Sequence, residues 1–201
     1  MSRNIIAILR GVLPQDAVAI CEEILAAGID RIEVPLNSPE PFDSIARIVD
    51  AIGDRALIGA GTVLSVADVD KVNAAGGRLV VSPDCNPEVI AHTKALGLQS
   101  YPGVMTPTEC FAALRAGADG LKFFPGDMIG PVGLKAVRAV LPKGTEAYAV
   151  GGANPSNFKD WVVAGATGFG IGSAIFKPGD TPAEVRAKAD AIVTAYDEAL
   201  A

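Results

Sequence analysis

Short β-like runs alternate with helix-like segments along the whole chain, and this alternation restricts the fold more than any other feature. Glycines that each close an Ala-rich or amphipathic stretch recur 20 to 27 residues apart, at Gly28, Gly53, Gly76, Gly97, Gly117, Gly144 and Gly165. Glycine is well suited to the left-handed position just beyond the end of a helix. Eight apolar runs typical of strands accompany them: IIAIL, RIEV, ALIGA, RLVV, QSYP, GLKFF, EAYAV and GFGIG.

Eight strand–helix units account for nearly all of the 201 residues. Strands that alternate with helices indicate parallel βαβ units. We therefore predict one α/β domain over residues 1–201, a (β/α)8 TIM barrel at the short end of its size range. The last helix, over residues 181–200, would close the outer ring. An open doubly wound sheet alternates in the same way and is the competing architecture.

The composition excludes several classes of protein. Hydrophobic residues make up 50% of the chain, which is enough for a packed core and excludes a disordered chain. A net charge of −6 and an aromatic content of 5% argue against nucleic-acid partners. The apolar runs are too short for a membrane span, and the N-terminal residues do not form a signal peptide pattern.

Histidine and cysteine usage narrows the chemistry further. The single histidine, His92, excludes a zinc site built on several histidines of one chain. The cysteines, Cys21, Cys85 and Cys110, are widely spaced and form no CxxC pair. This usage favours a reducing compartment, so we expect a cytoplasmic protein without disulfides.

Active sites of barrel enzymes lie at the carboxyl ends of the strands, and Lys122 is the sharpest candidate there. Of the eight lysines, it alone falls within a predicted strand. Because side chains alternate along a strand, Leu121 and Phe123 would face the helices and Lys122 the barrel interior. Burial lowers the pKa of an amine, and a neutral amine can attack a carbonyl and form a Schiff base. The alternative is a structural lysine that pairs with an interior carboxylate.

Glu33 follows the same logic in the segment RIEVP. Its neighbours Ile32 and Val34 would face the helices, which leaves Glu33 in the interior. A carboxylate beside a neutral lysine can shuttle protons. It could equally be the partner that keeps Lys122 charged.

The loops after the last two predicted strands indicate an anion site. Gly151 and Gly152 precede a helix start with Asn154 as the expected N-cap, and Gly172 and Ser173 precede a short turn. Backbone N–H groups in these two loops form a recurrent phosphate site in barrels. The alternative is ordinary turn geometry.

Two further polar residues follow predicted strands. Arg10 could bind a carboxylate or a phosphate through two parallel hydrogen bonds, or it could form an ion pair at the rim of the barrel. Thr62, after the GAG turn, could donate its hydroxyl to a carboxylate.

Seven motifs in order resemble the class I aldolases of 2-keto-3-deoxy-6-phospho sugar acids. They are AILRG, RIEVPLNS, LIGAGTV, VVSPD, LKFFP, AVGGANP and GFGIGSAIF, and they extend from Ile6 to about Phe176. In the gluconate branch of this family an arginine typically follows the catalytic glutamate by four residues. Here that position is Asn37, so the resemblance is to the galactonate branch.

The resemblance implies cleavage of a phosphorylated sugar acid into pyruvate and glyceraldehyde 3-phosphate, without metal or cofactor, by a homotrimer that binds neither nucleic acid nor membrane. It assigns the Schiff base to Lys122 and acid–base catalysis to Glu33. It assigns substrate binding to Arg10 and Thr62 at the carboxylate end, and to Gly152, Gly172 and Ser173 at the phosphate. The gluconate epimer and 4-hydroxy-2-oxoglutarate are alternative substrates. A phosphate-binding barrel isomerase or synthase and a non-catalytic sugar-phosphate-binding barrel are more distant alternatives.

Overall fold

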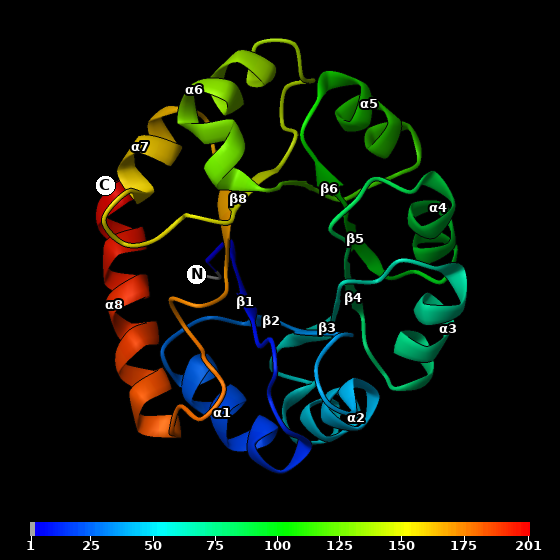
Figure 1. Cartoon of the computed structure of the whole chain (residues 1–201), viewed down its shortest axis with the longest axis vertical. Helices are drawn as coiled ribbons and strands as arrows, with labels where there is room; N and C mark the ends of the chain where they lie inside the picture. The colour runs from blue at the N-terminus through cyan, green and yellow to red at the C-terminus, as the bar shows by residue number, and fades with distance from the viewer. Residues whose placement is uncertain (1–2) are drawn as a thin grey trace.

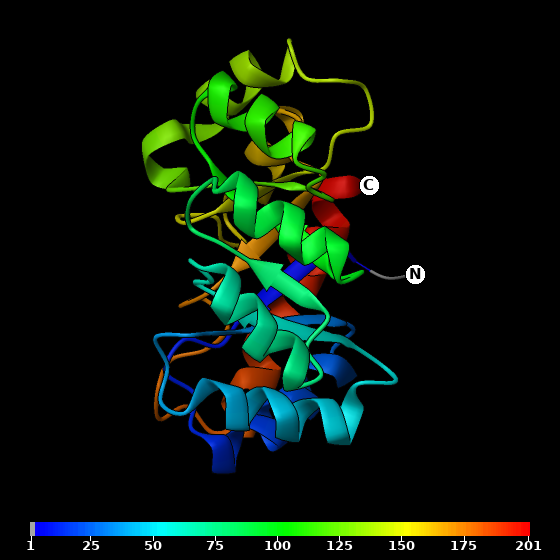
Figure 2. The same ribbon diagram turned by 90° about the vertical axis from the view of Figure 1, so that its right-hand side faces the viewer.

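The strands form one parallel sheet that curves into a barrel, and the computed structural model describes residues 3–201. Within these residues the sheet has nine strands: β1 (Ile5–Ile8), β2 (Arg31–Pro35), β3 (Leu57–Gly61), β4 (Leu79–Val81), β5 (Gln99–Tyr101), β6 (Gly103–Val104), β7 (Leu121–Phe123), β8 (Ala147–Val150) and β9 (Gly168–Ile171). Their order is β5-β4-β3-β2-β1-β9-β8-β7-β6. The first and last strands therefore lie side by side (Figure 2).

Eight helices in the described part of the chain surround the strands as an outer ring (Figure 1). They are α1 (Pro14–Ala26), α2 (Pro41–Ile52), α3 (Val66–Ala74), α4 (Pro87–Ala95), α5 (Pro107–Arg115), α6 (Gly126–Arg138), α7 (Phe158–Val163) and α8 (Pro182–Leu200). The predicted TIM barrel is confirmed, and the alternative of an open doubly wound sheet is excluded. None of these helices has the length and apolarity needed to cross a membrane.

The fifth predicted strand differs from the expectation of eight unbroken strands. It is divided into β5 and β6 by Pro102, which lacks the N–H that a central strand would donate. On one side Ser82 N donates to Tyr101 O (3.2 Å), and on the other Lys122 N donates to Pro102 O (2.9 Å). The divided segment thus joins β4 to β7 and completes the ring.

The glycine periodicity is explained by helix ends in most cases. Five of the glycines follow the C-cap of a helix with positive φ, namely Gly28, Gly76, Gly97, Gly117 and Gly165. Gly53 is itself the C-cap of α2 and has an ordinary helical φ of −64°. Gly144 lies in the loop after α6 rather than at its end.

Two apolar layers follow from the alternation of side chains along the strands. Ile5 and Ala7 of β1 pack in the large core between strands and helices. Ile6 and Ile8 pack in the barrel interior, with Tyr148 of β8. The predicted last helix is confirmed as α8. Thr181 is its N-cap, and the hydroxyl of Thr181 accepts a hydrogen bond from the backbone N–H of Glu184.

Candidate active site

Strand β7 places Lys122 inside the barrel. Its neighbours Leu121 and Phe123 pack in the core toward the helices, and only 6% of Lys122 is exposed. Its Nζ lies 4.8 Å from the ring centroid of Phe124. Burial lowers the pKa of Lys122; the carboxylate of Glu33 opposes this shift, and the positive charge of Arg10 adds to it. The amine of Lys122 therefore loses its proton more readily than that of an exposed lysine.

Strand β2 places Glu33 in the same interior, with 1% of the residue exposed. Its Oε2 has no hydrogen-bond partner among residues 3–201. Burial raises the pKa of Glu33 to about 7, against the opposing effects of Lys122 and Arg10. The ion pairs within 4.0 Å in the described residues all lie elsewhere. This geometry speaks against the alternative of a close buried Lys122–Glu33 salt bridge.

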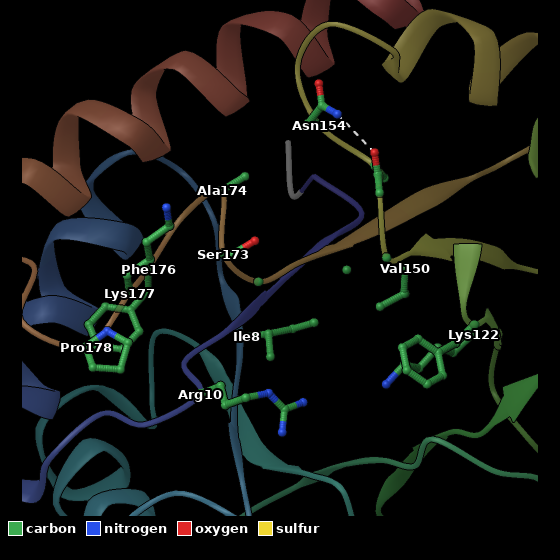
Figure 3. Close-up of a pocket in the computed structure, with 16 residues that line it drawn as sticks. Ile8, Arg10, Lys122, Val150, Asn154, Ser173, Ala174, Phe176, Lys177 and Pro178 are labelled. Atoms are coloured by element: carbon green, nitrogen blue, oxygen red, sulfur yellow. Dashed lines mark hydrogen bonds between the residues drawn. The ribbon is translucent and has the colours of Figure 1, made fainter. Parts of the chain in front are cut away.

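A pocket of about 450 Å³ opens beside Lys122 at the carboxyl ends of the strands (Figure 3). Arg10 and Lys122 line it, as do the predicted anion-binding residues Gly152, Gly172 and Ser173. A smaller, deeper cavity of about 10 Å³ is lined by Glu33 and Lys122 together. The fold thus gathers six of the seven predicted site residues around one connected site.

The loop after β8 has the expected glycines but a different helix start. Gly151 and Gly152 have φ values of 92° and 73°. Asn154 Nδ2 and Asn157 Nδ2 both donate to Gly152 O, at 3.0 and 2.9 Å. Asn157, rather than the predicted Asn154, occupies the N-cap of α7, but its side chain accepts no hydrogen bond from the helix. Asn154 instead caps the turn before α7: its Oδ1 accepts from Ser156 N (3.0 Å), and its backbone oxygen accepts from Asn157 N (3.0 Å). That turn holds the glycine loop in place.

The loop after β9 forms the predicted single turn. Ile175 N and Phe176 N both donate to Gly172 O, at 2.9 and 3.1 Å. Ser173 lies on the pocket side of this turn (Figure 3). Together the two loops line one side of the pocket with backbone and small side chains, which suits an anion.

Thr62 is the predicted residue that the fold sets apart from the pocket lining. It directly follows β3, and its backbone is in the left-handed region with φ of 56°. The half-buried residue lines neither of the two cavities described above.

Arg10 lies at the rim of the pocket rather than in a rim salt bridge. Its Nη1 donates to Asn37 Oδ1 at 2.5 Å, and this is its only side-chain hydrogen bond to residues 3–201. The guanidinium points toward the same space as the amine of Lys122 (Figure 3).

Other residues of the site escaped the sequence analysis as functional candidates. Gly61 is the clearest, because a Cβ at this position would lie 1.9 Å from Glu33 Oε2. Lys177 lines the pocket beside the loop after β9. The GAG segment carried a signal for Gly61, since a glycine within a strand often marks a close approach. No group of three or more His, Cys, Asp or Glu side chains in the described chain is arranged to hold a metal ion.

One known protein family matches this chain over most of its length. The model of the family described as KDPG and KHG aldolase matches residues 1–187. The chain belongs to this aldolase family. It is therefore a lyase, and the family resemblance expected from the seven motifs is confirmed.

Individual aldolases show the same relationship over almost the whole chain. A probable 2-dehydro-3-deoxy-6-phosphogalactonate aldolase of Rhizobium meliloti (strain 1021) is 48% identical over 98% of this chain and 93% of its own. The 2-dehydro-3-deoxy-6-phosphogalactonate aldolase of Escherichia coli (strain K12) is 45% identical over 98% and 96%. A solved native KDPGal structure superposes with a TM-score of 0.98 at 44% identity, covering 100% of this chain and 97% of the other.

Proposed function

We propose that this protein is a class I aldolase that cleaves 2-dehydro-3-deoxy-6-phosphogalactonate into pyruvate and glyceraldehyde 3-phosphate. The observation that carries the proposal is the buried amine of Lys122 beside the carboxyl group of Glu33, whose Oε2 has no hydrogen-bond partner in residues 3–201. Leaving two such groups inside a barrel without a close partner costs stability, and this cost is typical of a reactive site. The similar galactonate aldolases support the choice of substrate.

The substrate would span the pocket from Arg10 to the glycine loops. Arg10 can pair with the carboxylate of the 2-oxo acid through parallel hydrogen bonds. Gly152, Gly172 and Ser173 would hold the phosphate through backbone N–H groups and the serine hydroxyl. Thr62, next to Gly61, would support the carboxylate end from outside the pocket lining.

The first step joins the substrate to the enzyme. The neutral amine of Lys122 attacks the C2 carbonyl, and Glu33 transfers protons while the carbinolamine forms and loses water. With a pKa near 7, Glu33 can both donate and accept a proton near neutral pH. The product is an iminium ion at C2.

The second step breaks the C3–C4 bond. A base removes the proton of the C4 hydroxyl, the electron pair of the C3–C4 bond moves into the iminium, and glyceraldehyde 3-phosphate leaves. The remaining enamine takes a proton at C3, and water then releases pyruvate and regenerates Lys122. Because the iminium accepts the electron pair, EDTA is expected to leave turnover unchanged.

Trapping with borohydride tests the proposal. Incubation with pyruvate and borohydride should leave a reduced adduct on the peptide that contains Lys122, detectable by mass spectrometry. An isomerase, a synthase or a non-catalytic sugar-phosphate-binding barrel would form no such adduct. An unmodified Lys122 under these conditions would refute the proposed chemistry.

Substrate choice is tested separately from the chemistry. We expect kcat/KM to be higher for the galactonate than for the gluconate epimer or for 4-hydroxy-2-oxoglutarate, since Asn37 occupies the place of the arginine of the gluconate branch. A preference for the gluconate epimer would reassign the substrate while leaving the Schiff-base mechanism intact.

The proposal also includes the assembly. We propose that residues 1–201 act as one catalytic domain and that three copies form a homotrimer. Met128 and Val132 of α6 are 72% and 85% exposed, and such apolar side chains are typical of surfaces that associate. Light scattering in solution would give the number of subunits.

A further inference from the structure

Two neighbouring residues after β1 are tied to two neighbouring residues after β2. Arg10 Nη1 donates to Asn37 Oδ1 at 2.5 Å, and Gly11 N donates to Ser38 Oγ at 2.9 Å. Ser38 is buried, with 8% of it exposed, whereas Asn37 is exposed beside the pocket. The second bond fixes the backbone of the turn, and the first fixes the direction of the arginine side chain.

The same turn is packed from a third side. Gly11 has φ of 82°, and a Cβ built there would lie 2.8 Å from Pro178 Cγ. Pro178 belongs to the loop after β9 that also lines the pocket. The backbone beneath Arg10 therefore has little freedom, and its long side chain is the flexible part that Asn37 restrains.

Asn37 restrains Arg10 without neutralising it. An amide oxygen accepts a hydrogen bond but carries no net charge, and a guanidinium keeps further N–H groups free for other acceptors. No carboxylate within 4.0 Å pairs with Arg10 in residues 3–201. The free positive charge adds to the lowering of the pKa of Lys122 and opposes the rise that burial causes in the pKa of Glu33.

We infer that Asn37 is a positioning residue, which directs the uncompensated charge of Arg10 toward the carboxylate of the bound 2-oxo acid. The inference rests on the proposed function, because it takes Arg10 as the partner of that carboxylate. It adds a residue that acts through Arg10 and touches no reacting atom.

A double-mutant cycle with pyruvate and borohydride tests this inference. We would compare Asn37→Ala, Arg10→Ala, the double variant and the wild type by the pyruvate concentration that gives half-maximal trapping. Losing a charge-assisted restraint should raise this concentration about tenfold in Asn37→Ala, with little change at saturating pyruvate. Adding Asn37→Ala to Arg10→Ala should have no further effect, because the group that Asn37 directs is already gone.

Two further measurements separate positioning from a purely structural role. Lys122 faces Glu33 and Arg10, and the side chains of Tyr101 and Tyr148 line the same small cavity, with their hydroxyl groups bonded to Gln99, Arg31 and Glu146 at the base. Freeing Arg10 weakens its effect on the amine, so the pKa of Lys122 rises and trapping by Asn37→Ala should shift to higher pH. Asn37→Asp should weaken pyruvate binding at least as much as alanine, because its charge would cancel that of Arg10.

Asn73→Ala, at an exposed asparagine of α3, is the matched control and should trap pyruvate like the wild type. Wild-type behaviour of Asn37→Ala, or an effect that adds fully to that of Arg10→Ala, would overturn the inference and leave the proposed function standing. Wild-type binding by Asn37→Asp would overturn the requirement for a neutral partner. Failure of the wild-type enzyme to trap pyruvate would overturn the proposed function and this inference together.

Discussion

The two ends of the barrel interior treat polar groups in opposite ways. At the base, Arg31 Nη1 donates to the hydroxyl of Tyr148 (2.5 Å), which itself donates to Glu146 Oε2 (2.9 Å). Toward the mouth, Glu33 Oε2 has no partner among the described residues. Paired polar groups stabilise a fold, whereas unpaired ones are retained where they react.

Aromatic packing strengthens this contrast. The rings of Tyr101 and Tyr148 meet edge to face, with centroids 5.1 Å apart. They close the interior beneath Lys122 and Glu33, and burial raises the pKa of both tyrosines, so they stay neutral. The base thus has the paired and packed groups that stabilise a barrel, and the mouth has the unpaired group that the proposed chemistry needs, which is the usual division in barrels of this type.

The largest expected effect comes from removing the reactive amine. Lys122→Ala should lower kcat by on the order of 10⁴-fold or more, since no other lysine of residues 3–201 is buried inside the barrel and the second pocket lysine, Lys177, is exposed. Pyruvate release measures this loss. Lys143→Ala, at an exposed loop lysine, is the control and should keep wild-type activity. Substantial turnover by Lys122→Ala would mean that the end of the barrel interior with Lys122 and Glu33 is not the reactive end.

The second-largest loss of activity is expected when the space beside the carboxyl group of Glu33 is filled. In Gly61→Ala the new methyl group would lie 1.9 Å from Glu33 Oε2 and 2.3 Å from its Cδ, so Glu33 must move. We expect kcat to fall roughly 10²- to 10³-fold, as for loss of a general acid–base. Steady-state kinetics beside Glu33→Gln would check this, and circular dichroism would show whether the fold is kept. An active Gly61→Ala enzyme would show that the position of Glu33 is not critical.

The same carboxyl group should reduce stability at alkaline pH. Because the pKa of Glu33 is raised to about 7 in the fold, the folded state holds a proton that the unfolded chain has already lost between about pH 4.5 and 7. Stability contributed by this proton is therefore lost as the pH rises through that window. Glu33→Gln should be more stable than the wild type by about 3 kcal/mol at pH 8, and the gain should vanish below about pH 4.

Urea unfolding of both proteins at several pH values measures this difference. A Glu33→Gln variant that is less stable than the wild type at pH 8 would show that the carboxylate is paired after all. The polar groups at the mouth of the barrel would then be paired, as those at the base are.

The smallest effect on activity is expected from a substitution at the base of the barrel interior. Tyr148→Phe removes the hydroxyl that bonds both Arg31 and Glu146 while keeping the ring. We expect a loss of about 1–3 kcal/mol in the free energy of unfolding, with kcat nearly unchanged. Parallel unfolding and activity measurements test this separation. A large fall in kcat without loss of stability would extend the reactive region to the base.

The alternation of side chains along single strands made the interior positions of the two predicted catalytic residues predictable from the sequence. The positions of Lys122 and Glu33 inside the barrel follow from the period of two in LKF and IEV, which a short segment contains in full. The Gly151–Gly152 pair and Gly172 likewise predicted the two loops that line the pocket. Such local patterns need no knowledge of the rest of the chain.

Other features depend on contacts between distant segments. The sequence pattern indicated a helix start at Asn154, whereas in the structure Asn154 caps a separate turn and α7 begins after Asn157. The division of the fifth strand at Pro102 depends on its two neighbours in the ring. Thr62 follows a strand, as predicted, yet it has a left-handed backbone and lies outside the pocket lining.

The sequence by itself determined the eight-fold alternation, the interior position of the amine and the carboxyl group, and the family. Only the tertiary structure decided that Glu33 Oε2 is left unpartnered, that Gly61 makes room for it and that Asn37 holds Arg10. The reason is physical: side-chain direction is set by the local backbone, whereas these three features depend on the stagger of neighbouring strands when the barrel closes.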